Sequence, residues 1–284
     1  MESYALMIEE MREKAAAIWK RMQQKAPLVH CITNIVTVND CANILLAAGA
    51  RPTMAHHEAE VQEVTGGCEA LVCNLGATEN YHAMELAAAE SIKEKHPVII
   101  DPVGAGGSSF RREQIEKLLS YGNIAAIRGN ASEMRAVFEN CRTVTGVDVG
   151  VEDLIHPEKL IEAARRFSKE HDCVSIISGE KDIITDGDMV LSAANGDQLM
   201  SKITGTGCMS SVLLGAAFAV CEKGEYVQAA AAVTSAMGIC GEFAAEKCRE
   251  KQAGIMSFHL YLIDEMSKFS ENILQKHSKI DVFI

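Results

Sequence analysis

Hydrophobic and polar residues follow two different patterns along the chain. Over residues 1–25, apolar side chains recur at steps of three and four, which predicts an amphipathic helix. After Pro27, short apolar runs rich in β-branched residues alternate with Ala-, Glu- and Lys-rich segments of helical spacing, such as Tyr81–Lys95 and Pro157–Glu170. This alternation predicts an α/β fold with a mostly parallel central sheet and helices on both faces. The expected strands are Leu28–Ile32, Leu71–Leu75, Val98–Ile100, Ile124–Ile127 and Val174–Ile177.

The pattern changes in about the last third of the chain. We expect a hairpin-like stretch around Asn195-Gly196, a long Ala-rich helical region from Cys208, and a final amphipathic helix that starts at Ile255 and includes Ile273. No low-complexity linker, repeat of fixed period or Pro/Gly/Ser-rich boundary divides the sequence. We therefore predict a single domain over residues 1–284.

The overall charge and composition restrict the classes of partner. Lys and Arg number 27 against 39 Asp and Glu, which gives a net charge of -12, and aromatic residues make up 5% of the chain. A negative field repels phosphate backbones, no Lys/Arg-rich run offsets it, and few aromatic side chains are available to stack on bases. We therefore expect no nucleic-acid partner.

Neither a membrane partner nor an oxidising compartment is expected. The longest uncharged run, Ile203–Cys221, opens with a Gly-Thr loop, and its helical part is too short to cross ~30 Å of hydrocarbon. Acidic residues near the N-terminus do not fit a signal peptide. The ten cysteines, Cys141 among them, are scattered without a C-x-x-C pair, so most are expected to be small buried hydrophobes. The sequence therefore predicts a cytoplasmic protein.

Polar residues follow the predicted strands. In open parallel sheets, ligands bind beyond the carboxyl ends of the strands, so these residues are the first candidates for a functional site. They are Asn34, Asn74, Asp101, Asn130 and Ser178.

Two of these segments offer oxygen ligands for a metal ion. Asp101 closes an apolar strand, and Asn130 and Glu133 stand three residues apart at an expected helix start. Such residues can hold hydrated Mg²⁺, but Asn130 and Glu133 equally fit an N-cap with a helix-start acid. Arg128, just before them, fits either a polyphosphate contact or a surface ion pair.

The sharpest local feature is the segment Thr204-Gly205-Thr206-Gly207-Cys208, which leads directly into a helical run. Two glycines let the backbone turn tightly and approach a ligand, and the free amides of a first helical turn favour an anion. This is the geometry of an anion hole for a transferring phosphoryl group. Taken alone, the segment fits a simple glycine-bounded loop about equally well.

Other chemistry finds less support. The pair His56-His57 has no third ligand at a recognisable spacing, so exposed loop histidines are favoured over a metal site. The sequence contains no Walker A motif, no G-x-G-x-x-G opening a helix, no G-x-S-x-G elbow and no H-E-x-x-H helix. P-loop kinases, dinucleotide dehydrogenases, α/β-hydrolases and zincin proteases therefore lose their usual signals.

Taken together, these segments resemble the hydroxyethylthiazole kinases, a family of the ribokinase-like superfamily. The matching stretches follow the family order and span almost the whole chain. They are PLVHCITNIVTVNDCANILLAAGARPTMAHHEAEV from Pro27, ALVCNLGAT from Ala70, VIIDPVGAG from Val98, IRGNASE from Ile127, ISGEKDIITDG from Ile177 and NGDQLMSKITGTGC from Asn195.

The resemblance implies a single-domain, ribokinase-like, three-layer α/β/α fold. It also implies ATP-dependent phosphorylation of the primary alcohol of 4-methyl-5-(2-hydroxyethyl)thiazole, a step of thiamine salvage. Mg²⁺ is the implied cofactor, with ATP as co-substrate. The implied assembly is a homotrimer whose active sites lie at the subunit interfaces.

Carried over position by position, the resemblance assigns roles to residues of this chain. Asn34, Val36 and Met54 would line the thiazole pocket, with Gly205 beneath the hydroxyethyl group. For Met54, this replaces the default expectation of a core gap-filler. The nucleotide and metal residues would be Arg128, Ser178 and Asn130 for ATP, and Asp101 and Glu133 for the metal.

Cys208 stands where related superfamily kinases carry an Asp that takes the alcohol proton; the thiazole kinases commonly carry Cys there too. A helix N-terminus can lower the pKa of a thiol, yet phosphoryl transfer depends mainly on positioning and charge stabilisation. Our hypothesis is that Cys208 is a modest base or a packing element. Gly205, Thr206 and Gly207 would then contribute to catalysis, with Cys208, chiefly through their amides.

Three alternatives remain open at the level of sequence. The first is another ribokinase-fold vitamin-precursor kinase, acting on a hydroxymethylpyrimidine or pyridoxal. The second is a nucleotide-dependent nicotinamide-hydrate dehydratase on the same fold. The third is a non-catalytic nucleotide-binding regulator, motivated by Cys208 in place of Asp.

Overall fold

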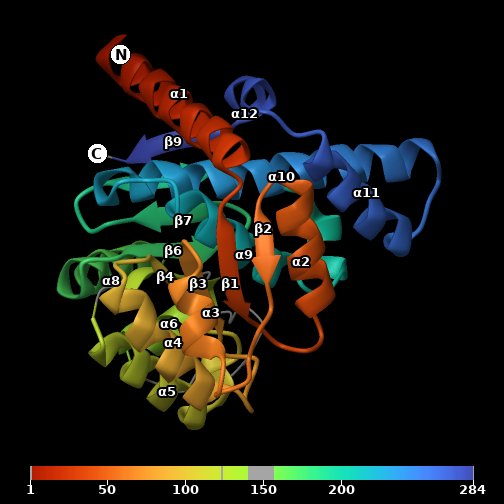
Figure 1. Cartoon of the computed structure of the whole chain (residues 1–284). Helices are drawn as coiled ribbons and strands as arrows, with labels where there is room; N and C mark the ends of the chain where they lie inside the picture. The colour runs from red at the N-terminus through yellow and green to blue at the C-terminus, as the bar shows by residue number, and fades with distance from the viewer. Residues whose placement is uncertain (1, 123, 140–156, 284) are drawn as a thin grey trace.

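The chain forms three layers, a central nine-stranded sheet with a layer of helices on each face, as the computed structural model in Figure 1 shows. The structure describes residues 2–122, 124–139 and 157–283, so Cys141 lies outside the described residues. The strand order is β2-β1-β3-β4-β5-β6-β7-β8-β9, with the first six strands parallel and the last three antiparallel. The predicted α/β/α architecture with a mostly parallel sheet is confirmed.

The strand boundaries follow the apolar runs of the sequence. The first predicted strand, Leu28–Ile32, has the predicted ends, and the other four are shifted by one residue or extended by up to three. The parallel strands are β1 (Leu28–Ile32), β2 (Arg51–Thr53), β3 (Ala70–Asn74), β4 (Val98–Asp101), β5 (Ile124–Asn130) and β6 (Val174–Ser178). The antiparallel strands are β7 (Asp182–Thr185), β8 (Val190–Ala193) and β9 (Ile280–Phe283).

Helices cover both faces of the sheet and bury a separate apolar cluster on each. Successive strand residues point to opposite faces, so Val72 joins one cluster while Leu71 and Cys73 join the other. One face carries α3 (Val61–Gly66), α4 (Tyr81–Lys93), α5 (Ser109–Ser120), α6 (Ala131–Glu139) and α8 (Pro157–His171). The other face carries α1 (Glu2–Lys25), α2 (Val38–Ala47), α9 (Thr206–Phe218), α10 (Tyr226–Glu250), α11 (Ile255–Ser267) and α12 (Glu271–His277).

The long helix α10 is the buried centre of its layer. The stretch Lys223–Glu250 is long and apolar enough to cross a membrane, but 89% of its most apolar window is buried inside the protein. In Figure 1 it runs across the sheet between α1, α11 and the strands. Its apolar character is therefore accounted for by burial in the core.

The expectation of a hairpin around Asn195-Gly196 is wrong. The hairpin joins β7 to β8 and turns at Gly187, which has a φ of 99°. Asn195 instead follows β8, where its side chain accepts a hydrogen bond from the Lys279 amide (2.8 Å) and donates to the His277 carbonyl (3.1 Å). The Asn195 side chain therefore ties the end of β8 to the segment before β9, and the Asn-Gly pair does not form the hairpin turn.

The expected single C-terminal helix is two helices. Helix α11 ends at Ser267, and Ser270 caps α12 by accepting a hydrogen bond from the Ile273 amide. Phe269, between them, packs edge-on against Trp19 of α1 with the ring centroids 5.1 Å apart. The 3.6-residue periodicity continues through this break because both helices bury their apolar side chains against the same layer.

Candidate active site

The carboxyl ends of the parallel strands gather the predicted polar residues at one edge of the sheet. Asn74 ends β3 and is paired in register with Asp101 at the end of β4, while Asn130 ends β5 beside Ser178 of β6. Helix α9 begins at the same edge, because the Ser211 hydroxyl of its second turn donates to Asp101 Oδ2 (2.8 Å). The sheet and α9 thus bring together the glycine loop and the strand ends.

Asn74 is the centre of a hydrogen-bond network at this edge. It is 1% exposed, and its amide nitrogen donates to Asp101 Oδ2 (2.9 Å) and to Cys208 Sγ (3.2 Å). Its carbonyl oxygen accepts from Asn34 Nδ2 (3.1 Å) and from the Gly76 amide (2.9 Å). The amide of Asn74 therefore fixes three candidate residues, two on strand ends and one on α9, in a single arrangement.

The glycine loop has the backbone conformation that the sequence predicts. Gly205 has a φ of 93° and is the N-cap of α9. The left-handed conformation favours glycine, and a Cβ at this position would lie 3.0 Å from Thr37 Cγ2, so that the Thr37 side chain would have to shift. The amides of the first turn, from Thr206 to Cys208, have no carbonyl partner within the helix and are available to an anion.

Arg128 lies beside this loop. Its guanidinium donates to the Gly207 carbonyl (3.3 Å), and a Cβ on Gly207 would lie 3.3 Å from the same nitrogen. Its positive charge also lowers the pKa of the buried Asp101 and Asp182, although burial is the larger effect and raises both. The arginine thus stands between the glycine loop and the acidic strand ends, where it can neutralise a polyphosphate.

A cleft of about 1120 Å³ opens from the glycine loop along the sheet edge. Arg128, Ser178, Thr206 and Gly207 line it near the anion-binding amides, so it continues directly from them. The volume exceeds that of a typical drug-sized pocket and suits a nucleotide. Further lining residues come from the segment after β8 and from α10: Asn195, Gly196, Asp197, Met200, Thr234, Met237, Gly238 and Arg249.

Glu133 is held by the start of its own helix. Its Oε2 accepts from the Asn130 amide (3.0 Å), while Asn130 Oδ1 accepts from the Glu133 amide (2.9 Å). This is a capping box, so the N-cap alternative is realised. The other carboxylate oxygen, however, accepts from the Gly104 amide (2.9 Å), which ties Glu133 to the segment after Asp101.

The two buried carboxyl groups resist ionisation. Burial, together with the nearby Asp101 charge, raises the pKa of Glu133 to about 7. Burial likewise raises the pKa of Asp101, against the opposing effects of Arg128 and of hydrogen bonds from Ser211 and Asn74. A divalent cation would favour the ionised form of both groups.

These residues fit a hydrated metal ion better than a closed protein cage. Within residues 2–122, 124–139 and 157–283, no group of three or more His, Cys, Asp or Glu side chains is arranged to hold a metal ion. Asp101 and Glu133 offer oxygen ligands only, which suits Mg²⁺, an ion that keeps several waters and completes its shell with substrate phosphates. The predicted pair is therefore compatible with a shared, phosphate-bridged ion.

Cys208 is a buried thiol rather than an activated one. It is 9% exposed, and burial, assisted by the Asp101 charge, raises its pKa to about 11. The amide nitrogens of Asn34 and Asn74 lie 3.5 and 3.2 Å from its sulfur. The expected lowering of the pKa by the helix N-terminus is therefore outweighed by burial, and the thiol is protonated at neutral pH.

The residues expected to bind the thiazole are on three separate segments. Asn34 accepts hydrogen bonds from the Val36 and Thr37 amides (3.1 and 3.2 Å), and Thr37 contacts Gly205, so the segment before α2 reaches the glycine loop. Val36 is 68% exposed in the single chain, whereas Met54, just after β2, packs partly buried against the core.

Some site residues were missed by sequence reasoning. Thr37 contacts the glycine loop, and Ser211 donates a hydrogen bond to Asp101. Asp182 lines the cleft, where its Oδ1 accepts a hydrogen bond from the Gly179 amide (2.8 Å). Ser211 follows Cys208 by three residues on α9. Residues at this spacing lie on one face of a helix, so the sequence could have indicated that Ser211 lies near the same edge as Cys208. Thr37 and Asp182 gave none, because their contacts depend on the tertiary fold.

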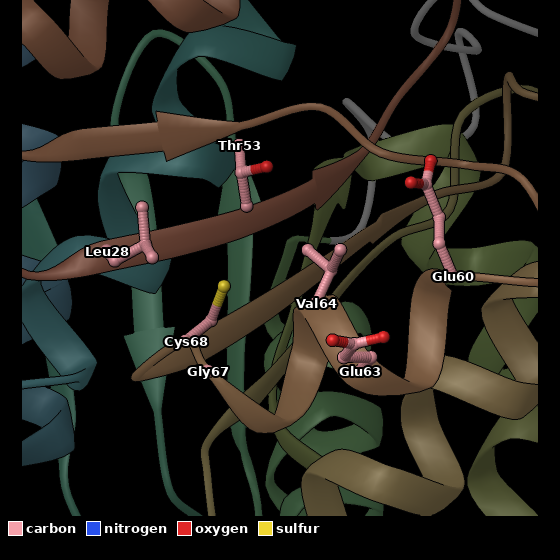
Figure 2. A pocket seen from close by; sticks show the side chains of 7 residues that line it. All are labelled: Leu28, Thr53, Glu60, Glu63, Val64, Gly67 and Cys68. Carbon is pink, nitrogen blue, oxygen red and sulfur yellow. The ribbon is translucent and has the colours of Figure 1, made fainter.

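Two other features lie outside the hydrogen-bond network of Asn74. His56 and His57 are exposed, as predicted for loop histidines. A smaller cavity of about 420 Å³, shown in Figure 2, lies between α3, the segment that follows it, and strands β1 and β2. The charged side chains that line it are Glu60 and Glu63, which repel phosphates, so it does not fit a nucleotide.

Comparison with known proteins adds to this geometry. The sequence model of the hydroxyethylthiazole kinase family matches residues 19–272. The chain belongs to this family. A hydroxyethylthiazole kinase from Clostridium botulinum (strain Eklund 17B / Type B) is 40% identical over 96% of this chain and 98% of its own length. Hydroxyethylthiazole kinase 1 of Methanosphaera stadtmanae is 38% identical over 97% and 99%.

A solved structure extends the likeness to the fold. The hydroxyethylthiazole kinase protein from Pyrococcus horikoshii OT3 superposes with a TM-score of 0.83 and 30% identity, over 95% of this chain and 99% of that one. The predicted ribokinase-like fold is thereby confirmed, together with the family resemblance. The chain therefore shares both sequence and fold with members of the hydroxyethylthiazole kinase family.

Proposed function

We propose that this protein transfers the γ-phosphoryl group of ATP to the primary alcohol of 4-methyl-5-(2-hydroxyethyl)thiazole, a step of thiamine salvage. The observation that carries the proposal is the position of the Gly205–Cys208 loop. Its free amides lie where the nucleotide-sized cleft meets the polar strand ends. Family membership supplies the acceptor, because the named relatives are hydroxyethylthiazole kinases.

In the proposed mechanism, the chain acts through position and charge. ATP occupies the cleft, with Arg128 and Ser178 along its phosphates. The first-turn amides of α9 then stabilise the charge on the transferring group, in a site where such donors need no reorganisation. Donors of this kind are worth roughly 3–4 kcal/mol of activation free energy each in well-studied enzymes.

The acceptor alcohol needs little help from a base. Phosphoryl transfer passes through a loose transition state in most analyses, so the attacking oxygen keeps its proton until late. A Cys208 thiol with a pKa of about 11 is a poor proton acceptor at neutral pH. We therefore assign Cys208 to packing against Asn34 and Asn74, which positions the loop, rather than to proton transfer.

Mg²⁺ is part of the proposal. Asp101 and Glu133 would hold the ion together with phosphate oxygens and water. When bound, it would neutralise charge on the β- and γ-phosphates. Support comes from the two buried carboxyl groups, whose pKa values stay raised by burial even though Arg128 lies nearby, so that a further cation would stabilise their ionised forms.

We also propose that the chain works as a homotrimer with active sites between subunits. Large apolar side chains are exposed on α2, on α11 and on the loop before α2, and α2 packs against α11. These residues, the α2/α11 surface, are Ile35 (90% exposed), Val36 (68%), Leu46 (58%), Met256 (68%) and Leu260 (62%). Their loop adjoins Asn34 and Gly205, so a second copy that covered them would also enclose the acceptor side.

The test is ADP release from MgATP with hydroxyethylthiazole, beside hydroxymethylpyrimidine and pyridoxal. We expect a kcat/KM for the thiazole at least tenfold above that for either other alcohol. Turnover on one of the other alcohols alone would move the assignment to another vitamin kinase. No turnover on any alcohol would favour the nicotinamide-hydrate dehydratase or a nucleotide-binding regulator.

A further inference from the structure

The two glycines of the loop have different neighbours. Gly207 faces Arg128 and the nucleotide cleft, whereas Gly205 faces the first turn of α2. A Cβ built on Gly205 would lie 3.0 Å from Thr37 Cγ2 and 3.6 Å from Asp40 Oδ2. The carboxylate of Asp40 is therefore packed against the loop on the side away from Arg128.

Asp40 meets a histidine from another helix. His259 of α11 places Nε2 3.1 Å from Asp40 Oδ1, and the two side chains are only 19% and 17% exposed. The Nε2 atom is buried and makes no hydrogen bond to the described part of the chain. Asp40 is its nearest charged neighbour on α2, and the two form an ion pair when the imidazole carries a proton. One carboxylate oxygen of Asp40 thus faces His259 of α11, and the other faces the glycine loop.

This arrangement joins three elements that meet at the acceptor side. Asn34 caps the segment that leads into α2 and also contacts Cys208. A shift of α2 would therefore move both the loop and Asn34, while leaving Arg128 and Ser178 on their own strands. Small misplacements of reacting groups cost large factors in rate, so the anchoring of α2 bears directly on phosphoryl transfer.

We propose that Asp40 and His259 are positioning residues, which hold the first turn of α2 against Gly205 and so place the acceptor alcohol in line with the γ-phosphate. The proposal rests on the proposed function for its kinetic consequence. It does not require either side chain to touch substrate. The plain alternative is that Asp40 is an ordinary helix-start acid and that His259 is its surface partner.

The test is a double-mutant cycle with Asp40→Asn, His259→Phe and the double variant. His259→Gln serves as the conservative variant, because its amide can still reach Asp40. We expect each single variant to lower kcat/KM for hydroxyethylthiazole 5- to 30-fold, with the KM for ATP changed less than twofold. The double variant should be no worse than the worse single one, and His259→Gln should recover most of the loss.

A matched control is Glu63→Gln, which removes a first-turn acid of α3 away from the glycine loop. It should leave kcat and both KM values unchanged. Losses that multiply in the double variant, or an equal rise in the KM for ATP, would overturn the proposal. So would a loss in Glu63→Gln as large as in Asp40→Asn, because any helix-start acid would then have the same effect.

A second measurement separates this proposal from the proposed function. Amide hydrogen exchange is compared between the native protein and His259→Phe, without acceptor. We expect faster exchange in the peptide that contains Gly205 and unchanged exchange in the peptide that contains Ser178. If the native protein has no activity on the thiazole but this change is seen, the proposed function fails and the positioning role stands. Unchanged exchange at Gly205 would overturn the positioning role, whatever the activity.

Discussion

At the scale of single residues, the site depends on groups whose protonated forms are favoured by burial. Burial keeps the Cys208 thiol protonated and raises the pKa of Glu133 to about 7. Asn74 links the thiol to Asp101, since its side-chain amide contacts both Cys208 and Asp101. A site of this kind stabilises charge that arrives with the substrate, rather than supplying a charged nucleophile or base.

Replacing Cys208 tests its role in proton transfer. We expect Cys208→Ala to retain kcat within about tenfold, because the loop amides and Arg128 are unchanged. Cys208→Asp should match or exceed the native kcat, because a carboxylate accepts a proton more readily than a thiol whose pKa is about 11. Steady-state kinetics at saturating ATP decides this. A complete loss of kcat in both variants would contradict the assignment.

Glu133 should make stability depend on pH in the absence of metal. Its pKa is raised from 4.5 to about 7 in the folded state, so the folded protein binds more protons than the unfolded chain between these values. The free energy of unfolding should therefore fall as the pH rises from about 4.5 to 7, by an amount on the order of 1–3 kcal/mol. Urea denaturation of the native protein and of Glu133→Gln, across this range, measures the difference.

In Glu133→Gln, the decrease in the free energy of unfolding that is due to Glu133 should be absent. Asp101 and Asp182 have raised pKa values too, so some fall remains in both proteins. Equal slopes in the native protein and the variant would show that Glu133 does not titrate in this way. Addition of Mg²⁺ with ATP should flatten the slope of the native protein.

At the scale of secondary-structure elements, the start of α9 is the part on which the account depends. Gly205 adopts a φ of 93°, and a Cβ there would lie 3.0 Å from Thr37 Cγ2, so that the Thr37 side chain would have to shift. The segment before α2 and the first turn of α9 are thus fitted to each other. Their contact places the free amides at the end of the cleft.

Gly205→Ala should therefore reduce kcat by at least 100-fold. A left-handed conformation costs a residue with a Cβ about 1–2 kcal/mol, so the expected loss of stability is small beside the loss of activity. Gly254→Ala is the matched control, because Gly254 is also a helix N-cap but has a negative φ and no atom within 4 Å of the added Cβ. Its kcat and melting temperature should match those of the native protein. Full activity in Gly205→Ala would contradict the role of this turn.

The elements also show what the sequence could predict. The five buried parallel strands were found because each is a run of apolar, β-branched residues. β2 was missed because Arg51–Thr53 is short and lacks such a run. β9 was missed because its place in the sheet depends on pairing with β8, which is distant in the sequence. The glycine loop and the strand-end residues were predicted. The link between them through Asn74 was not, because it joins three separate strands and a helix.

At the scale of the whole molecule, the site lies at one edge of the sheet, and its acceptor side is continuous with the exposed α2/α11 surface. The walls of the cleft come from this chain, since β6, α9 and α10 all line it. The residues proposed for the thiazole are less enclosed, as Val36 shows. A second copy is therefore expected to matter more for the acceptor than for ATP.

Disrupting the α2/α11 surface tests the homotrimer. Leu260→Glu should shift the mass measured by light scattering toward the monomer and raise the KM for hydroxyethylthiazole by tenfold or more, because a charge buried between subunits is unpaired. The control is Tyr121→Lys, which changes an exposed aromatic residue at the end of α5, in the opposite layer. It should leave mass and KM unchanged. A native protein with the mass of one chain would contradict the trimer but leave the cleft and the glycine loop in place.

Transfer of the γ-phosphoryl group from ATP to hydroxyethylthiazole can be measured by isotope labelling. The native protein is incubated with Mg²⁺, hydroxyethylthiazole and ATP that carries ¹⁸O in the terminal oxygens of its γ-phosphate, and the products are analysed by mass spectrometry. We expect a thiazole phosphate ester that carries the labelled phosphoryl group, formed in equal amount with ADP. Release of ADP with labelled inorganic phosphate and no ester would contradict it.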